Sequence, residues 1–201
     1  MGEFASMSRK RRREIRRMAF IDTLPILMGY TTMGFAAGVS LAAQSHVACA
    51  PLWAGLCGLL FVSGTLSFAI IPAFAGTMSL GALALTALGV QFRYAFYGFS
   101  VVGKWKTVPF FRKWFLVHSL ADEIFVMDIA CPLKDEVESR YYSLWNHLLD
   151  VTYWTAGTTA GGIAGAELPI PSKGIEFAMV ALFIVIFTDQ IREVVEKWIR
   201  R

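Results

Sequence analysis

Residues 23–92 contain no Asp, Glu, Lys or Arg, and this charge-free run limits the possible folds more than any other feature of the sequence. A helix needs about 20 apolar residues to cross the roughly 30 Å hydrocarbon core of a bilayer, so the run has room for about three crossings. A soluble domain of 201 residues would carry more than the 17% of charged residues found here. The sequence therefore indicates an integral membrane protein.

Hydropathy divides the chain into about five to six hydrophobic segments, and we predict an all-α membrane fold. The predicted segments are 20–43, 50–71, 75–102, 142–164 and 174–188, with a less apolar stretch at 114–130. We interpret residues 1–6 as a leader that does not belong to the native protein, 7–19 as a basic cytoplasmic N-terminus, 20–190 as the membrane domain and 191–201 as an amphipathic C-terminal helix.

Basic residues gather before the first apolar segment, between Lys104 and Lys113, and at the carboxyl end. The positive-inside rule places all three groups in the cytoplasm. Three full crossings between Arg17 and Lys104 would put the second group outside, so we expect one segment to be broken or re-entrant. The glycine-rich segment 75–102 is the first candidate, and the alternative is that 114–130 crosses and violates the rule locally. Because the basic run adjoins a membrane segment, anionic lipid accounts for it and we expect no nucleic-acid partner.

Arg93 is the one formal charge between Thr23 and Gly103, and Gln91 and Tyr97 lie close to it in sequence. An ionisable side chain inside a membrane segment is a functional candidate by default. A guanidinium holds a carboxylate through two parallel hydrogen bonds, so Arg93 suits a substrate that carries a carboxylate. The alternative is that Arg93 extends to the membrane edge, although Lys104 lies about 15 Å further along a continuous helix.

Asp122 and Glu123 lie within the apolar stretch 114–130. Either carboxylate could pair with Arg93, and either could take up a proton as it leaves water. A purely structural ion pair is the alternative reading.

Trp154 opens a run in which Gly157 and Gly161 recur at four-residue spacing, a pattern typical of closely packed membrane helices. The same small residues could instead form the wall of a substrate cavity. We interpret His46 and His118 as ordinary polar residues, and the three cysteines, Cys49, Cys57 and Cys131, as small buried ones. No metal-ligand spacing, cofactor motif or catalytic motif is present, so we expect no metal, no cofactor and no enzyme activity.

Five motifs follow one another along the chain. They are Leu24-Pro25 with Gly29, Gly34 and Gly38; residues 61–68 around Gly64; Gln91-Phe92-Arg93-Tyr94; Asp122-Glu123; and Trp154-Thr155-Ala156-Gly157. In this order they resemble the large subunit of branched-chain amino-acid exporters, the AzlC family. The chain departs from the family pattern at Ser67, where Gln is usual, and at Gln91 and Tyr94, where Asn and His are common.

The resemblance implies a secondary transporter that exports leucine, isoleucine, valine or methionine across the bacterial cytoplasmic membrane, with a small AzlD-type membrane subunit as partner and the N-terminus in the cytoplasm. We expect coupling to protons. The expected substrate-binding residues are Arg93, Gln91, Tyr97, Ser67, Gly64 and Trp154, and the expected proton-coupling residues are Asp122 and Glu123. The alternative is a membrane assembly or regulatory subunit that does not itself transport.

Overall fold

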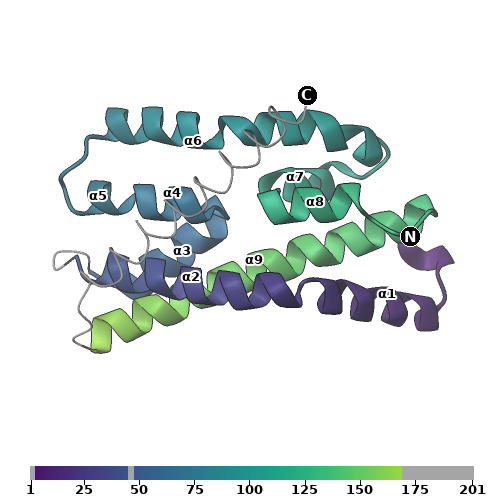
Figure 1. Ribbon diagram of the computed structural model, residues 1–201, viewed down its shortest axis with the longest axis horizontal. Helices are drawn as coiled ribbons and strands as arrows, with labels where there is room; N and C mark the ends of the chain where they lie inside the picture. Colours follow the sequence, from purple (N-terminus) through teal and green to yellow (C-terminus); the bar gives the residue numbers. More distant parts are fainter. Residues whose placement is uncertain (1–2, 45–47, 169–201) are drawn as a thin grey trace, which may run out of the picture.

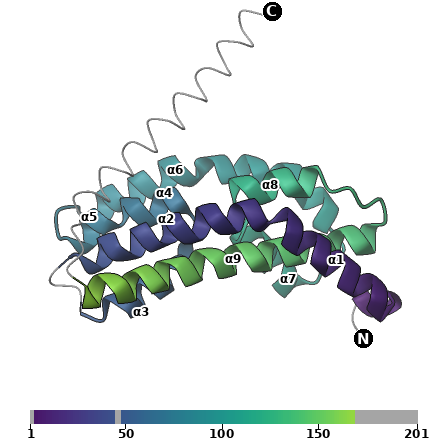
Figure 2. The ribbon, with the colours of Figure 1, turned by 60° about the horizontal axis from the view of Figure 1, so that its bottom comes forward.

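The computed structural model describes residues 3–44 and 48–168, which form helices joined by short connections and contain no strand. Three long helices run along the molecule: α2 (Leu24–Ala42), α6 (Leu80–Val101) and α9 (Glu136–Glu167). Helices α2 and α9 lie side by side and point the same way, whereas α6 points the opposite way (Figures 1 and 2).

Helix α1 (Arg9–Asp22) carries the basic N-terminal run and leads into α2 through Thr23. The side chain of Ser8 caps α1 by accepting a hydrogen bond from the backbone N–H of Arg11 at 3.1 Å. The short helix η2 (Val102–Trp105), which carries Lys104, follows α6 at the same end of the molecule (Figure 1). We call this end, where α1, η2 and the start of α9 lie, the basic end.

Residues 50–74 form a first hairpin (Figure 1). It starts at the end of the molecule opposite the basic end, runs toward the basic end and then turns back to where it started. Its ascending helix is α3 (Ala50–Phe61), and its returning helices are α4 (Gly64–Ala69) and α5 (Ile71–Phe74). The reversal falls at Val62, whose φ of 36° lies in the left-handed region, and at Ser63, whose side chain caps α4. The rings of Trp53 and Phe74 meet across the open end of the hairpin, with centroids 5.7 Å apart.

Residues 110–129 form a second hairpin, which enters from the basic end. It consists of α7 (Phe110–His118) and α8 (Asp122–Ile129). Lys104 holds the end of α8 by donating a hydrogen bond to the backbone carbonyl of Asp128 at 2.5 Å. The tips of the two hairpins meet, since the Nε2 atom of His118 lies 3.1 Å from the carbonyl oxygen of Leu59.

The predicted break is real, but its predicted position is wrong. Helix α6 is continuous over 22 residues, and the reversal lies instead between α3 and α4. The stretch at 114–130 does not form one long helix either, because α7 and α8 are separate and antiparallel. With both hairpins returning to the end they came from, only α2 and α6 run the full length between Arg17 and Lys104, and both basic groups lie at one end.

Small residues let α9 approach α2 and α3 to backbone distance, as the glycine spacing in α9 predicts. A Cβ atom added at Gly161 would lie 2.0 Å from the carbonyl oxygen of Phe35, and one at Gly38 would lie 2.1 Å from that of Thr158. On the α3 side, a Cβ at Gly58 would lie 2.3 Å from the hydroxyl of Thr158. These three helices therefore form one tightly packed layer.

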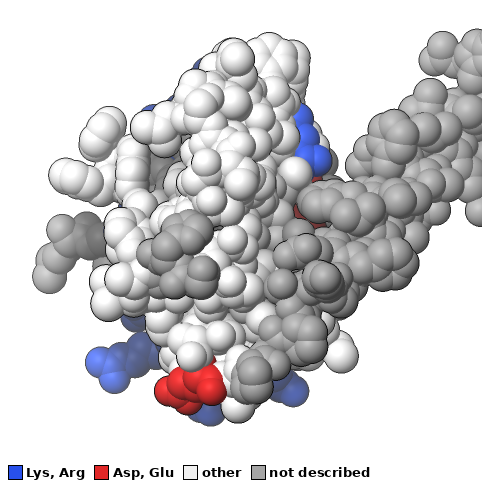
Figure 3. Space-filling view, turned by 90° about the vertical axis from the view of Figure 1, so that its left-hand side faces the viewer, with Lys and Arg blue, Asp and Glu red and all other residues white. Residues whose placement is uncertain are grey.

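Large apolar side chains cover much of the outer surface. Exposed examples on three helices are Met28, Phe35, Leu52, Leu56, Leu60, Leu80, Leu85, Leu88, Phe92, Phe96 and Phe99. The end opposite the basic end is mostly uncharged over the described atoms (Figure 3). Within the described part of the chain, α2 is the one helix that is both long enough and apolar enough to cross a membrane; α6 is longer, but Gln91 and Arg93 interrupt its apolar sequence.

Several residues and segments named in the sequence analysis lie outside the described residues or near the chain ends. The predicted segment 174–188, the helix 191–201 and His46 lie outside the described residues. Cys57 is buried as expected and Cys131 partly so, but Cys49 is exposed because it lies in the connection before α3. Within residues 1–6, the ring of Phe4 packs against that of Tyr141 at 4.9 Å.

Candidate functional site

An ion pair between Arg93 and Asp122 lies where the hairpin tips approach α6. The Nη2 atom of Arg93 is 3.0 Å from Oδ2 of Asp122. The pair is single rather than bidentate, and Nε of Arg93 and Oδ1 of Asp122 have no hydrogen-bond partner among the described residues. The two side chains are 39% and 37% exposed, so a small anion can reach the guanidinium.

Glu123, the next residue of α8, bonds to a different helix. The hydroxyl of Tyr30 in α2 donates a hydrogen bond to Oε2 of Glu123 at 2.8 Å. The Tyr30 ring in turn meets the fully buried Trp154 of α9 edge to face, with centroids 5.3 Å apart. The first turn of α8 is thus tied to α6 through one carboxylate and to the α2–α9 layer through the other.

The tip of the first hairpin completes this region from the other side. The hydroxyl of Ser63 donates a hydrogen bond to the side-chain oxygen of Gln91 at 3.2 Å. A Cβ atom added at Gly64 would lie 3.6 Å from both the Trp154 ring and the methyl group of Met33. Gly64, Met33 and Trp154 therefore present an apolar wall beside a polar group of side chains.

Seven of the eight predicted site residues come together in this way: Arg93, Gln91, Tyr97, Gly64, Trp154, Asp122 and Glu123. The eighth, Ser67, lies at the margin. Ser67 is buried one turn into α4, where its hydroxyl has no hydrogen-bond partner among the described residues and borders a pocket of about 10 Å³. Tyr97 interacts with Asp122, and its ring stacks on Phe125 with centroids 4.2 Å apart, so it joins the site to the core around Trp105.

Sequence reasoning overlooked Asp150 of α9. This residue is fully buried, and neither carboxylate oxygen has a hydrogen-bond partner in the described part of the chain. The signal was present in the sequence, because Asp150 interrupts the predicted hydrophobic segment 142–164 and an acid in such a segment is a functional candidate.

A second buried polar group, also overlooked, links the second hairpin to α9. His147 places its Nε2 atom 3.1 Å from Asp128 and its Nδ1 atom 2.8 Å from the hydroxyl of Ser119, while Ser143 donates to Asp128 at 2.5 Å. The order serine, histidine, aspartate suggests a hydrolytic triad. Ser119, however, is completely buried and donates its proton to the carbonyl of Phe115 at 2.7 Å. The group is therefore a structural connection between α7, α8 and α9.

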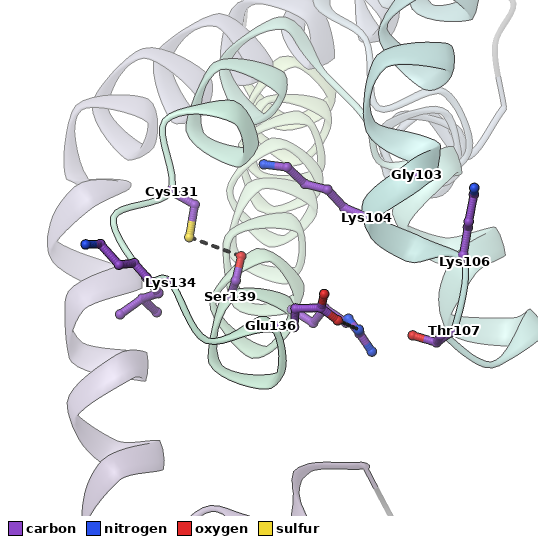
Figure 4. Close-up of a pocket in the computed structure, with 10 residues that line it drawn as sticks. Gly103, Lys104, Lys106, Thr107, Cys131, Lys134, Glu136 and Ser139 are labelled. Atoms are coloured by element: carbon purple, nitrogen blue, oxygen red, sulfur yellow. Dashed lines mark hydrogen bonds and ion pairs between the residues drawn. The ribbon is translucent and has the colours of Figure 1, made fainter.

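An open pocket of about 430 Å³ lies at the basic end, between η2 and the connection from α8 to α9 (Figure 4). Lys104, Lys106 and Lys134 line it, together with the ion-paired Glu136 and Arg140. The hydroxyl of Ser139 donates to the sulfur of Cys131 at 3.3 Å on its wall. None of the predicted site residues lines this pocket, which is too charged to favour an apolar ligand.

Comparison with known proteins agrees with the resemblance drawn from the motifs. Residues 25–168 match the family described as AzlC protein. The branched-chain amino acid transport protein AzlC of Bacillus subtilis is 30% identical over 175 residues, which cover 87% of this chain and 67% of the relative. Two relatives named only as uncharacterized membrane proteins are similar at the same level. One, from Haemophilus influenzae, is 28% identical over 88% of this chain and 71% of its own length, and one from Helicobacter pylori is 30% identical over 86% and 74%.

No solved structure matches the chain. The family match covers the two hairpins and all three long helices almost completely, so it includes every residue of the candidate site. The chain is a membrane protein and belongs to the AzlC family.

Proposed function

We propose that this protein is the large subunit of a secondary transporter that exports hydrophobic amino acids, above all leucine, isoleucine and valine. The observation that carries the proposal is the accessible Arg93–Asp122 pair, which lies where two opposed hairpins meet. The name of the Bacillus subtilis relative, a branched-chain amino acid transport protein, supports the choice of substrate.

The carboxylate of the substrate would compete with Asp122 for Arg93. A substrate carboxylate can use two guanidinium nitrogens at once, whereas Asp122 contacts only Nη2. The Nε atom is buried and has no hydrogen-bond partner among the described residues, and it would become available when Asp122 is released. Exchange of one anion for the other keeps the guanidinium neutralised throughout. The released Asp122, or Glu123, then receives the ammonium group of the substrate.

The apolar wall formed by Gly64, Met33 and Trp154 would receive the aliphatic side chain. The absence of a side chain at Gly64 leaves contact space of about one methyl group against the Trp154 ring, since a Cβ there would meet it at 3.6 Å. Gln91 and Ser63 supply polar contacts on the opposite side. Tyr97, which interacts with Asp122, would add a further polar contact, whereas the buried Ser67 lies too far toward the margin to be a first choice for direct contact.

The topology suits alternating access. Helix α2 followed by the first hairpin has a counterpart in α6 followed by the second hairpin, and the two units point in opposite directions (Figure 1). Transporters often place their substrate site between inverted repeats, at discontinuous helices near mid-membrane. Here each hairpin reaches the site from one end of the molecule, so movement of one or the other would open the site to one side.

We further propose the bacterial cytoplasmic membrane as the location, with several crossings, the N-terminus in the cytoplasm, coupling to protons and a small AzlD-type partner. Helices α1 and η2, which carry basic residues, lie at one end of the molecule (Figure 1), and this supports the orientation through the positive-inside rule.

A non-transporting assembly subunit was the alternative suggested by the small-residue faces. In α2, α3 and α9 the closely packed small residues contact one another across the helix interfaces of this chain. These packed positions are therefore not open to a partner.

The test is uptake of labelled leucine, isoleucine, valine and methionine into inverted membrane vesicles, with the chain alone and with a candidate small partner. We expect Arg93→Ala to reduce uptake at least tenfold and Arg93→Lys to reduce it less, because a lysine keeps the charge but not the bidentate geometry. Arg16→Lys is the matched control, since Arg16 lies over the Trp145 ring, 5.5 Å from its centroid, and outside the site. Uptake by stably inserted Arg93→Ala at the rate of the unchanged protein would refute the role of Arg93.

A further inference from the structure

Asp150 is a carboxyl group without any visible partner in the centre of the molecule. It is 0% exposed, and both of its oxygens lack a hydrogen bond within the described residues. An ionised carboxylate in such surroundings is strongly disfavoured, because it has lost its water and gained no donor or cation.

The groups that face Asp150 from the neighbouring helices do not neutralise it. Glu123 of α8 lies close enough for its negative charge to repel an ionised Asp150. Tyr30 of α2 is also near, but its hydroxyl proton already serves Glu123. Cys57 is the titratable side chain that α3 buries, and it brings no positive charge.

The other titratable groups along this side of α9 are already engaged. His147 bonds to Asp128 of α8 and Ser119, and Asp22 of α1 accepts a hydrogen bond from Tyr142 at 2.7 Å. The nearest described cation of the site, Arg93, is paired with Asp122. The negative charge of Glu123 and the absence of a neutralising cation both disfavour an ionised Asp150, so the neutral, protonated form is favoured.

We propose that Asp150 is the carboxyl group that carries the coupled proton of the transport cycle, leaving Asp122 and Glu123 to exchange with the substrate. The inference rests on the proposed transport function and adds to it the residue that binds the proton. In the conformation described here Asp150 is protonated and out of contact with water. In a conformation in which a hairpin opens, water reaches the group, the Oδ–H bond breaks and the proton passes to water on the inner side. A proton from the outer side then restores the acid, so that one proton enters the cell for each amino acid that leaves.

The test separates exchange of substrate from coupling to protons. The purified full chain, with a small partner if transport requires one, is reconstituted in liposomes. Exchange of labelled for unlabelled leucine is measured at equal pH on both sides, and accumulation of leucine is measured under an imposed pH gradient. Asp150→Asn mimics the protonated acid, and Asp22→Asn is a control that removes a carboxylate outside the site.

We expect Asp150→Asn to exchange leucine at close to the normal rate. The leucine accumulation that the pH gradient drives should be at least tenfold lower than in the unchanged protein. Asp22→Asn should retain both activities. Accumulation by Asp150→Asn at the normal level would overturn the proposal. So would a loss of leucine binding that parallels a loss of exchange, because Asp150 would then be the ammonium ligand. Accumulation driven by a sodium gradient instead of a pH gradient would overturn it as well.

A second measurement keeps the proposal testable if transport itself fails. A protonated carboxyl group in the folded protein gives an infrared carbonyl band, and that band should be absent from Asp150→Asn. The band together with no transport of any hydrophobic amino acid would refute the proposed function but not the proton site, whereas a missing band would refute the proton site. If Asp150→Asn does not fold, Asp150→Glu, which keeps an acid there, should retain both the band and the coupling.

Discussion

Replacing Gly161 by Ala should destabilise the protein far more than the same substitution in α6. The added Cβ would lie 2.0 Å from the carbonyl oxygen of Phe35 and 2.8 Å from its Cα atom, so the clash is with backbone. A normal contact needs more than 3 Å, and α2 would have to move away from α9 by over 1 Å to provide it. Gly38 and Gly34 hold the same interface closed over two further turns, so this movement cannot stay local.

The size of the effect follows from the cost of overpacking. Inserting a methyl group into a well-packed interior costs about 1–3 kcal/mol, and a clash with two rigid helices belongs near the upper value of about 3. The matched control is Gly98→Ala in α6, where nothing lies within 4 Å of the added Cβ. That change should stabilise the helix by up to about 1 kcal/mol because alanine loses less backbone entropy than glycine.

Thermal unfolding of the two detergent-purified variants, followed by tryptophan fluorescence, measures the difference. The two effects add to a separation of about 4 kcal/mol, which corresponds to roughly 8–16 °C in Tm for a protein of this size. Equal melting temperatures for Gly161→Ala and the unchanged protein, or for the two variants, would show that α2 and α9 do not touch as described.

Three further substitutions test other parts of the structure. Glu138→Gln should lower the Tm at neutral pH but not in acid. Hydrogen bonds from Arg11 at 2.6 and 2.7 Å depress the pKa of Glu138, so the stabilising effect of this carboxylate is lost as pH falls through the lowered pKa. An unchanged Tm at neutral pH would refute this. Cys49→Asn should raise the Tm by about 2–4 °C, since Cys49 is exposed with φ 55° and asparagine tolerates that conformation about 1 kcal/mol better; a lower Tm would contradict the strain. His147→Ala should lower the free energy of unfolding by about 3 kcal/mol, because it leaves a cavity and removes a hydrogen-bond partner of the buried Asp128. Leucine binding to the folded variant should stay unchanged, and a loss of binding would make His147 and Asp128 part of the substrate site.

Much of the architecture follows from the charge and glycine patterns of the sequence. The charge-free run predicts an apolar segment at 20–43, and α2 occupies Leu24–Ala42 within it, with Pro25 in the first turn as is common at helix starts. The spacing of Gly157 and Gly161 predicts the close approach to α2, since only small residues allow backbones so near.

The position of the reversal could not be predicted in the same way. The glycines in 75–102 suggested a break there, yet α6 is continuous, and a Cβ atom added at Gly81, Gly89 or Gly98 would meet nothing within 4 Å. The actual reversal at Val62 contains no glycine or proline at the turning residue. Ser63 caps α4 through a local hydrogen bond from Leu66, and it also donates to Gln91 of α6. The second contact is tertiary, and local sequence patterns do not reveal contacts of that kind.

Candidate site residues were easier to predict than their pairing. A charge in an apolar segment is conspicuous, which is why Arg93, Asp122 and Glu123 could be named from sequence. Which acid meets Arg93 depends on the rotation of α8, because adjacent residues of a helix point in directions about 100° apart. That rotation is set by the packing of Phe125 on Tyr97 and the burial of Ile124, and it turns Asp122 toward α6 and Glu123 toward α2.

The same rotation connects binding to movement. The first turn of α8 is held by two polar contacts, Asp122 with Arg93 and Glu123 with Tyr30. A zwitterionic amino acid competes for both contacts. Its carboxylate replaces Asp122 at Arg93, and its ammonium group attracts Asp122 and Glu123. Substrate binding therefore releases the start of α8 from α6 and α2, while Lys104 still holds its other end through the Asp128 carbonyl. The second hairpin would then pivot about the basic end and open its tip. Spin labels at the exposed Val126 and Leu85 should report a longer mean distance when leucine is added, and an unchanged distance in protein that binds leucine would refute the pivot.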